Sequence, residues 1–548
     1  MAPCITGIYA RQTARSVYCR SAGIRKTAYF SPRANSRSPD ERTEARSRID
    51  MIEQNRHVVM FSAEAAPYIK VGGLGDVVGA LPKALESLGL RVTVILPACQ
   101  DISWEMFDIQ PSDAGCFSIP VGLDVVRAEV AEATMPETGV RVFFLRGGGY
   151  FDRPGLYDDP ETGDGYPDNM QRFAFYARAG IELLRRLGEP VHVIHCHDSQ
   201  TALIPGLLHT VFENDPFFAR TGTLFTIHNL AYQGLHEKED LIWTGIDPAR
   251  FHPGSPFEYW GKINLAKIGI ETSDIVNTVS RTYAREISSG PEYGCGLEGV
   301  LRNRAPDLYG IINGIDYSEW NPESDSLIAA NYSAADLSGK AICKAALQSA
   351  VGLPRSAGRA PLIGIISRLV DQKGFDLIEE AIECIAGCDL QMAILGTGQQ
   401  KYHQMLETLA ARNPHKVAVR LGFDNRLAHQ IEAGSDMFLM PSRYEPCGLN
   451  QLYSLRYGTV PIVRSTGGLA DTVTDFNPDD NSGAGFVFKK YSADQMMEAL
   501  KRALAAYQCV ECWQRLMIQG MRQNWSWETS AQEYVKLYDI LLQKRKSN

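Results

Sequence analysis

The chain has 548 residues, of which 45% are hydrophobic and 22% charged, a balance that favours packed globular domains over disorder. The formal net charge is -9, and no long Lys/Arg cluster with interleaved aromatic residues follows residue 50, so nucleic acids and anionic membranes are not expected as main partners. The apolar runs are strand-sized, well short of the ~20 residues that a membrane-spanning helix needs.

The first fifty residues differ in composition from the rest. Residues 1–39 hold six Arg and one Lys but no Asp or Glu, which is typical of an organelle transit peptide. Met51 directly precedes the first strand pattern, so residues 1–50 are read equally well as a spurious extension. The first alternative predicts a plastid location and the second a cytoplasmic one.

Twelve cysteines are scattered without the spacing of a disulfide framework, which favours reduced thiols. Cys509 and Cys512 form a C-x-x-C pair. With no second pair and no clear strand before it, we interpret this pair as incidental. Its role in regulation stays open.

From residue 58 on, short β-branched runs alternate with helix-period segments, the pattern of parallel sheets covered by helices. Strands are predicted at 57–62 and 92–96. The helix between them carries one apolar face, formed by Val77, Leu81, Leu85 and Leu88. Pro82 predicts that this helix kinks or starts late.

The same unit recurs after residue 360. A strand is predicted at 361–367, and the helix after Gly374 has one apolar stripe, formed by Phe375, Ile378, Ile382 and Ile385. Further strands are predicted at 392–395, 417–421, 437–440 and 460–463. The sequence therefore predicts an α/β protein with two doubly wound domains, at 51–316 and 317–525, and a ligand site between them. Residues 526–548 are expected to form a helix that returns to the first domain.

The loop before the first predicted helix has the composition of an anion site. A Gly-Gly turn that opens onto a helix brings backbone amides close to a pyrophosphate, and Lys70 before Gly72 and Gly73 adds positive charge. A lone Lys before Gly-Gly is most often an ordinary loop. Residues 72–76 (GGLGD) recur as residues 467–471 (GGLAD), which favours two related lobes.

A series of longer motifs makes a family resemblance specific. They are KVGGLGDVVGALPKAL (70–85), FTIHNLAYQG (225–234), TVSRTYAREI (278–287), YGCGLEGVLRNR (293–304), INGIDYSEWNP (312–322), SRLVDQKGFDL (367–377), PSRYEPCGLNQLYSLRYGTVPIV (441–463) and STGGLADTV (465–473). In this order, over nearly all of residues 57–530, they resemble the glycogen/starch synthase family, in particular bacterial-type glycogen synthases that use ADP-glucose.

The resemblance implies a GT-B fold, with an acceptor-side first lobe and a nucleotide-sugar-side second lobe. It also implies a retaining glucan 4-α-glucosyltransferase of glycogen or starch biosynthesis, with ADP-glucose and an α-1,4-glucan as partners and no metal or other cofactor. A UDP-sugar-dependent transferase and a catalytically silent glucan-binding homologue are the alternatives, since fold alone does not prove activity.

Arg368 and Lys373 are the expected phosphate ligands. They follow a predicted strand, where two cations can stabilise the charge of a departing diphosphate. Surface charges on a solvated loop would be the better interpretation of an isolated pair. The family's Arg and Lys at these positions bind the nucleotide phosphates, and the resemblance extends that role to this chain.

His197 is the expected catalytic histidine. The segment His195-Cys196-His197-Asp198 is also conceivable as a metal site, but no second ligand cluster supports that interpretation. The family motif, His-x-His-Asp-Trp-His, implies that His197 contacts the transferred sugar. Ser199 and Gln200 replace the usual Trp and His, which puts acceptor-side contacts in doubt.

Glu445 is the expected catalytic carboxylate. It lies in the EPCGL segment after the predicted strand at 437–440, where a carboxylate can bind sugar hydroxyls or cap the next helix. The resemblance favours the sugar-binding role. Asp168, in Tyr-Pro-Asp-Asn, is a further catalytic candidate. The remaining substrate-binding candidates are Asp76, Asn229, Tyr232, Cys447, Gly448, Leu449, Gly467 and Gly468.

Overall fold

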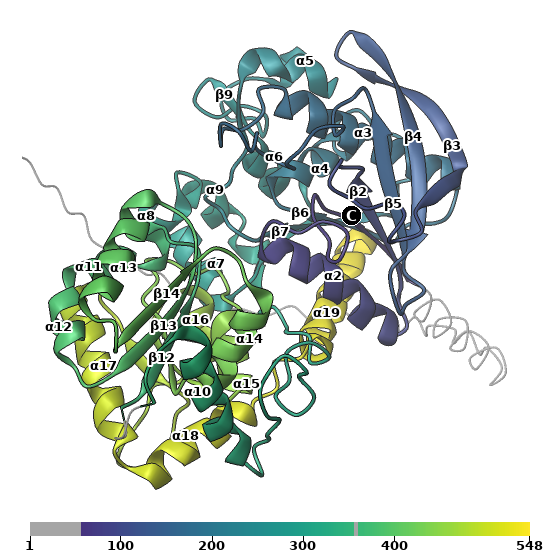
Figure 1. The fold of residues 1–548 in the computed structure, drawn as a ribbon. Coiled ribbons are helices and arrows are strands. Elements are labelled where there is room, and N and C mark those ends of the chain that lie inside the picture. The colour runs from purple at the N-terminus through teal and green to yellow at the C-terminus, as the bar shows by residue number, and fades with distance from the viewer. Residues whose placement is uncertain (1–55, 356–359, 548) are drawn as a thin grey trace, which may run out of the picture. The chain divides into compact units, whose positions relative to one another are not determined.

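The computed structural model describes residues 56–355 and 360–547. The segment 1–50, interpreted above as a transit peptide or an extension, lies outside the described residues. Within them, the chain builds two large sheets, each covered by helices on its faces (Figure 1). The predicted α/β class is therefore confirmed. No described helix combines the length and the apolar character that crossing a membrane requires.

The first sheet has the order β11-β10-β7-β6-β1-β2-β5-β4-β3. Its strands are β1 (His57–Phe61), β2 (Arg91–Pro97), β3 (Gln110–Val121), β4 (Asp124–Thr134), β5 (Arg141–Gly147), β6 (Val193–His197), β7 (Gly222–Ile227), β10 (Ile275–Thr278) and β11 (Leu308–Gly310). All neighbours pair in parallel except β3 with β4 and β4 with β5, which are antiparallel. The central strand β1 is buried along its whole length, as a strand covered on both faces should be.

Helices pack on both faces of this sheet. The longer ones are α2 (Gly73–Ser87), α3 (Asn169–Leu187), α4 (Leu203–Leu208), α6 (Leu265–Thr272), α7 (Arg281–Ser289) and α9 (Glu298–Asn303). Helix α2 begins at Gly73 and continues through Pro82, so the predicted late start is wrong. Burial of Val77, Leu81 and Leu85 on one face offsets the single amide that proline lacks.

A short two-stranded ribbon, β8 (Leu235–Glu237) with β9 (Lys262–Asn264), and six short helical segments complete the described part of the first lobe. These segments are α5 (Leu241–Thr244), α8 (Pro291–Gly294), η1 (Ser199–Thr201), η2 (Lys238–Asp240), η3 (Pro248–Arg250) and η4 (Ala305–Asp307).

The second sheet is entirely parallel, with the order β14-β13-β12-β15-β16-β17. Its strands are β12 (Leu362–Ile366), β13 (Gln391–Gly396), β14 (Val417–Leu421), β15 (Met437–Met440), β16 (Val460–Arg464) and β17 (Phe486–Phe488). Because all strands run the same way, the loops that follow them meet at one edge of the sheet.

The helices of the second lobe precede, connect and follow its strands. They are α10 (Ser338–Val351), α11 (Phe375–Glu380), α12 (Ile382–Gly387), α13 (Gln400–Arg412), α14 (Asn425–Gly434), α15 (Asn450–Arg456), α16 (Gly467–Thr472), α17 (Ala493–Tyr507) and α18 (Val510–Met521). The single helix expected after Gly374 is divided at Ala381 into α11 and α12, yet Phe375, Ile378 and Ile385 are buried as the apolar stripe predicts.

The C-terminal helix α19 (Trp527–Ser547) belongs to the core of the first lobe. Its Tyr534, Tyr538 and Leu541 are buried there, and it packs against α2 and β7 (Figure 1). The predicted return of this helix is confirmed. Ile315 and Ser526 form a bridge where the chain passes between the lobes. The domain boundaries named above stay a prediction.

Cys509 and Cys512 are joined by a disulfide at the start of α18, in contrast to the expectation of reduced, incidental thiols. Their Cα atoms are 5.3 Å apart, a separation that a disulfide spans. The helix start brings the two thiols together, a local geometry that cysteine counting does not reveal. The other described cysteines are free.

Candidate active site

Lys373 and Glu445 form an ion pair at the carboxyl edge of the second sheet. Lys373 ends a 3-10 turn after β12, and Glu445 lies in the loop after β15, the strand that pairs with β12. The Lys373 Nζ is 2.7 Å from the Glu445 Oε2, which also accepts from the Ser442 hydroxyl at 3.0 Å. Only 4% of Glu445 is exposed. Its Oε1 has no partner among the described residues, so one carboxylate oxygen is left for a ligand.

Gly467 and Gly468 support the loop that carries Glu445. A Cβ on Gly467 would lie 1.9 Å from the Glu445 carbonyl oxygen, and one on Gly468 would lie 2.0 Å from that of Cys447. The Gly467 amide donates to Glu286 of the first lobe, and the Gly468 amide donates to the Glu445 carbonyl. Both amides therefore have acceptors within the protein, and direct substrate binding by these glycines stays a prediction.

Replacing Gly467 with alanine should displace Glu445, because the added methyl group has no room and the backbone φ of +44° disfavours a side chain. We expect a loss of roughly 1–3 kcal/mol of folding stability together with a large loss of kcat. Chemical denaturation and steady-state kinetics check this. Gly387→Ala is the matched control, since its Cβ would meet no atom within 4 Å. Wild-type kinetics in the Gly467 variant would contradict the supporting role.

Arg368 and Tyr232 bring the two lobes into contact. The Arg368 Nη1 donates to the Tyr232 hydroxyl at 3.2 Å, and its Nη2 approaches the Gln372 Oε1 at 3.5 Å. These partners are uncharged, and no carboxylate pairs with Arg368 in the part of the chain that the structure describes. The guanidinium charge is therefore available to an anion. Tyr232 is 55% exposed beside it.

The residues after Glu445 line the start of α15. Cys447 is buried, and burial raises the pKa of its thiol to about 12, so the thiol is neutral and packs. Gly448 has a φ of +74°, which favours glycine at this turn. The Leu449 Cδ1 is 4.0 Å from the place of a Cβ on Gly73, so this loop approaches the glycine loop of the first lobe.

His197 ends β6 and is fully buried. Its Nδ1 is 3.0 Å from the His228 Nε2, and its ring lies 4.0 Å from that of His195. Burial, reinforced by these two rings, holds the pKa of His197 well below its ordinary value, so the imidazole is neutral. Its Nε2 is buried without a recorded partner among the described residues. That atom is available for one hydrogen bond to a ligand.

Asp198 was not among the predicted site residues, although it belongs to the quoted His-x-His-Asp segment. Its backbone has a φ of +58° and a ψ of -179°, a region that is essentially limited to glycine. Its Oδ1 accepts from the His228 amide at 2.7 Å. Burial raises the pKa of Asp198 to about 7, and hydrogen bonds from the amides of His228 and Asn229 oppose that rise. The strained residue therefore fixes the loop after β7.

That loop carries the predicted acceptor residues Asn229 and Tyr232. The Asn229 side-chain oxygen accepts from the Ala231 amide at 3.1 Å, which closes a turn. The Tyr232 amide donates to the Asn229 carbonyl. Asp198 and Asn229 thus direct Tyr232 toward Arg368.

In the glycine loop before α2, some backbone amides are bonded to a carboxylate and others are open. The amides of Val71 and Gly72 donate to Glu64 at 2.7 and 2.8 Å. No acceptor among the described residues is recorded for the amides of Gly73 and Leu74, which begin α2. The open amides, at a helix N-terminus, suit an anion.

Lys70 and Asp76 lie beside these amides. The Lys70 Nζ is 2.6 Å from the Asp76 Oδ1. Burial raises the pKa of Asp76, and Lys70 opposes that rise. Asp76 is thus a partner of Lys70 and not an N-cap of α2, whose N-cap is Gly72.

Asp168 stands apart from the other predicted catalytic residues. Its carboxylate forms two hydrogen bonds with Arg153, of 3.0 and 2.6 Å. It precedes α3 without capping it through its side chain. No recorded contact joins it to His197 or Glu445, so its catalytic role stays a prediction.

Comparison with known proteins extends these observations. Residues 57–303 match the family model described as starch synthase catalytic domain, and residues 354–513 match glycosyl transferases group 1. The chain is 45% identical over 490 residues to a glycogen synthase of Koribacter versatilis, covering 89% of this chain and 99% of that protein. A glycogen synthase of Geotalea daltonii is likewise 45% identical over 489 residues, with the same coverage. The chain belongs to the glycogen/starch synthase family.

Solved structures agree with this assignment. The catalytic domain of starch synthase IV from Arabidopsis thaliana, bound to ADP and acarbose, is 34% identical, with a TM-score of 0.82 over 89% of this chain and all of that one. A sucrose-phosphate synthase from Thermosynechococcus elongatus, 17% identical with a TM-score of 0.54 over 89% of this chain, shares the fold. The GT-B fold is thus confirmed, and the protein is a glycosyltransferase.

One more side chain of this glycosyltransferase follows a strand at the same edge of the second sheet. Phe423 lies in the loop after β14 and is 87% exposed. It follows Gly422, whose φ of +132° is open to glycine alone. An exposed aromatic ring at this edge offers a face on which a base can stack. The sequence did not predict this role, because a single Phe in a sequence does not reveal whether its side chain is exposed.

The metal alternative for the histidine segment has little support. Both ring nitrogens of His195 have protein partners, the Tyr538 hydroxyl at 3.0 Å and the Thr226 hydroxyl at 2.6 Å. Among the described residues, no three His, Cys, Asp or Glu side chains gather in a way that could hold a metal ion. The expectation that this glycosyltransferase needs no metal stays a prediction.

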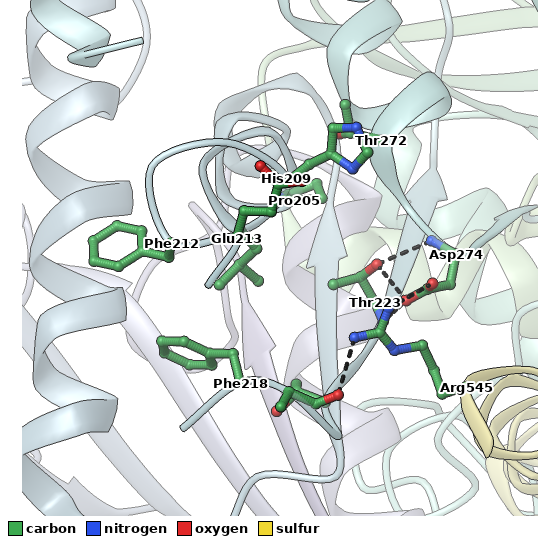
Figure 2. Close-up of a pocket in the computed structure, with 12 residues that line it drawn as sticks. Pro205, His209, Phe212, Glu213, Phe218, Thr223, Thr272, Asp274 and Arg545 are labelled. Atoms are coloured by element: carbon green, nitrogen blue, oxygen red, sulfur yellow. Dashed lines mark hydrogen bonds and ion pairs between the residues drawn. The ribbon is translucent and has the colours of Figure 1, made fainter. Parts of the chain in front are cut away.

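A cavity of about 260 Å³ lies at the edge of the first sheet where β7 begins, away from the carboxyl ends of the strands (Figure 2). Figure 2 shows Arg545 of α19 beside Asp274 and Thr223, and Phe212, Phe218 and His209 on other sides of the space. The Thr223 hydroxyl donates to Asp274 at 2.9 Å. None of the predicted site residues lines this cavity, so it is separate from the candidate active site.

Proposed function

We propose that the chain transfers glucose from ADP-glucose to the non-reducing end of an α-1,4-glucan, with retention of configuration. The observation that carries the proposal is the ion pair of Lys373 with the buried Glu445 carboxylate, at the carboxyl edge of the second sheet that Arg368 also follows. Relatives named glycogen synthase, and a related starch synthase bound to ADP and acarbose, support the donor and acceptor classes.

The cations would act on the departing group. Arg368 offers a planar guanidinium whose charge has no carboxylate partner in the described part of the chain, and Lys373 offers a point charge. Placed in advance where negative charge develops on the diphosphate, such groups stabilise the transition state without reorganisation. The open amides of Gly73 and Leu74 add donors from the first lobe.

His197 and Glu445 would hold the sugar. Among the described residues, the neutral His197 has no partner at its Nε2 and Glu445 has none at its Oε1, so each can form one hydrogen bond to a sugar hydroxyl. Glu445 also places negative charge near an oxocarbenium-like centre. In a front-face displacement, the acceptor 4-hydroxyl oxygen bonds to C1 as the bond from C1 to the phosphate oxygen breaks, and the leaving phosphate takes the hydroxyl proton.

The donor and the metal requirement are tested together. The chain from Met51 is incubated with a malto-oligosaccharide and either ADP-glucose or UDP-glucose, with and without EDTA. We expect chain elongation that prefers ADP-glucose and survives chelation, because Arg368 and Lys373 supply the cations. Product lengths by chromatography and anomeric configuration by NMR provide the measurement.

Each alternative has its own result in this assay. A preference for UDP-glucose would replace the proposed donor, and loss of elongation in EDTA would refute metal independence. Inversion at C1 would refute the front-face route. Glucan binding without elongation on either donor would indicate the catalytically silent homologue.

A further inference from the structure

Glu64, which follows β1, is a buried carboxylate that the proposed mechanism does not yet use. It is 4% exposed, and both of its oxygens are occupied. The Oε2 accepts from the amides of Val71 and Gly72, and the Oε1 accepts from the Tyr157 hydroxyl at 2.6 Å. Its main chain is fixed by the Ser62 side chain, which accepts from the Glu64 amide and donates to the Glu64 carbonyl. Such a carboxylate is held rigidly.

This arrangement decides which amides of the glycine loop a ligand can reach. With Val71 and Gly72 turned toward Glu64, the next two amides, of Gly73 and Leu74, are left open at the start of α2. Charged hydrogen bonds of this kind are about twice as strong as neutral ones, so the loop has little freedom to rotate. The Glu64 charge would also repel a phosphate from the occupied side of the loop.

Tyr157 extends the same contact to a second loop. Its carbonyl accepts from the Asn169 side chain at 3.0 Å, and Asn169 follows the catalytic candidate Asp168. Arg172, buried at the same place, donates to the Leu156 carbonyl and to Asn169. The carboxylate of Glu64 therefore connects the loop of Lys70 with the loop that precedes α3.

We propose that Glu64 is a positioning residue for the nucleotide-sugar diphosphate: it fixes the Lys70 loop so that the amides of Gly73 and Leu74 face the donor, and Tyr157 holds it in place. This inference rests on the proposed function. It assigns no chemical step to Glu64. The carboxylate acts through the amides and the lysine that it orders.

Glu64→Gln tests the proposal in the full chain. Glutamine keeps the size of the side chain but carries no charge. When its oxygen accepts from the two backbone amides, its NH2 group must donate to the Tyr157 hydroxyl, so that bond reverses and all three bonds become neutral and weaker. We expect the KM for ADP-glucose and the Kd for ADP, by calorimetry, to rise about tenfold. Because Tyr157→Phe removes one of the three bonds, we expect an increase of about threefold. The double variant should be no worse than Glu64→Gln alone.

Glu86→Gln is the matched control. Glu86, at the other end of α2, also accepts from a loop amide, that of Gly139, at 3.0 Å. We expect Glu86→Gln to leave the KM for ADP-glucose and the Kd for ADP unchanged. If loosening α2 were enough to weaken donor binding, this variant would raise both constants as well. Thermal melting identifies a variant that does not fold. Should Glu64→Gln fail to fold, Tyr157→Phe decides.

Two different failures are distinguishable. If the unmodified chain neither binds ADP nor elongates glucan, the proposed function is wrong. If the unmodified chain is active and Tyr157→Phe and any folded Glu64→Gln stay within twofold of it in both constants, or if Glu86→Gln shows the same increase, the positioning role is wrong.

Discussion

Replacing Lys373 with alanine is expected to lower kcat by about 10²–10³, the usual cost of removing one group aimed at developing negative charge. The Lys373 side chain is 19% exposed, and its ion pair with Glu445 fixes its charge beside that carboxylate. The KM for ADP-glucose should change less than kcat, because charge on the diphosphate grows as the glycosyl bond breaks. Steady-state kinetics over a range of donor concentrations separates the two constants.

The substitution also leaves the Glu445 carboxylate buried beside the Ser442 hydroxyl alone. Removing one partner of a buried ion pair costs about 3–5 kcal/mol, so the stability of the variant must be measured beside its kinetics. Lys373→Ala combined with Glu445→Gln should regain stability without regaining activity. Lys401→Ala is the matched control, because Lys401 pairs with Asp371 nearby but is exposed. Normal turnover in a folded Lys373→Ala enzyme would refute the assigned role.

The strands were the most predictable part of the fold. The apolar run at 437–440 coincides with β15, because a strand buried on both faces must be apolar throughout. The run at 417–421 coincides with β14, an edge strand in which Val417 alone is buried. The antiparallel pair β3 and β4 was not predicted. Both strands are largely exposed, so Gln110–Val121 carries many polar residues and shows no continuous apolar run.

The sequence predicted some residues of the candidate site and missed others. Lys373 and Glu445 lie in long ordered motifs, and the pairing of β12 with β15 brings those motifs together. Glu64 and Asp198 were missed because they act on backbone amides, and a sequence does not show which amides a carboxylate reaches. Asp168 was chosen by resemblance alone, and its partner in the structure is Arg153.

Replacing His197 with alanine is expected to lower kcat by about 10²–10³ as well, since it removes the imidazole whose Nε2 would bind the sugar. Because the pKa of His197 lies well below 6.5, the wild-type imidazole stays neutral from pH 6 to 8 and its titration should leave no step in kcat over that range. Glucan elongation at several pH values measures both effects. His209→Ala, in the separate cavity, is the matched control and should retain full activity.

Stability gives an independent check on the state of His197. A histidine whose pKa is lowered by folding remains neutral in the folded chain, whereas the unfolded chain gains a proton as the pH falls below 6.5. The free energy of unfolding should therefore fall between pH 7.5 and 5.5, and His197→Ala should make that fall smaller. Urea denaturation at both pH values measures it. An equal fall in the variant and the unmodified chain would mean that His197 is protonated in the folded enzyme, and its neutral contact with the sugar would have to be abandoned.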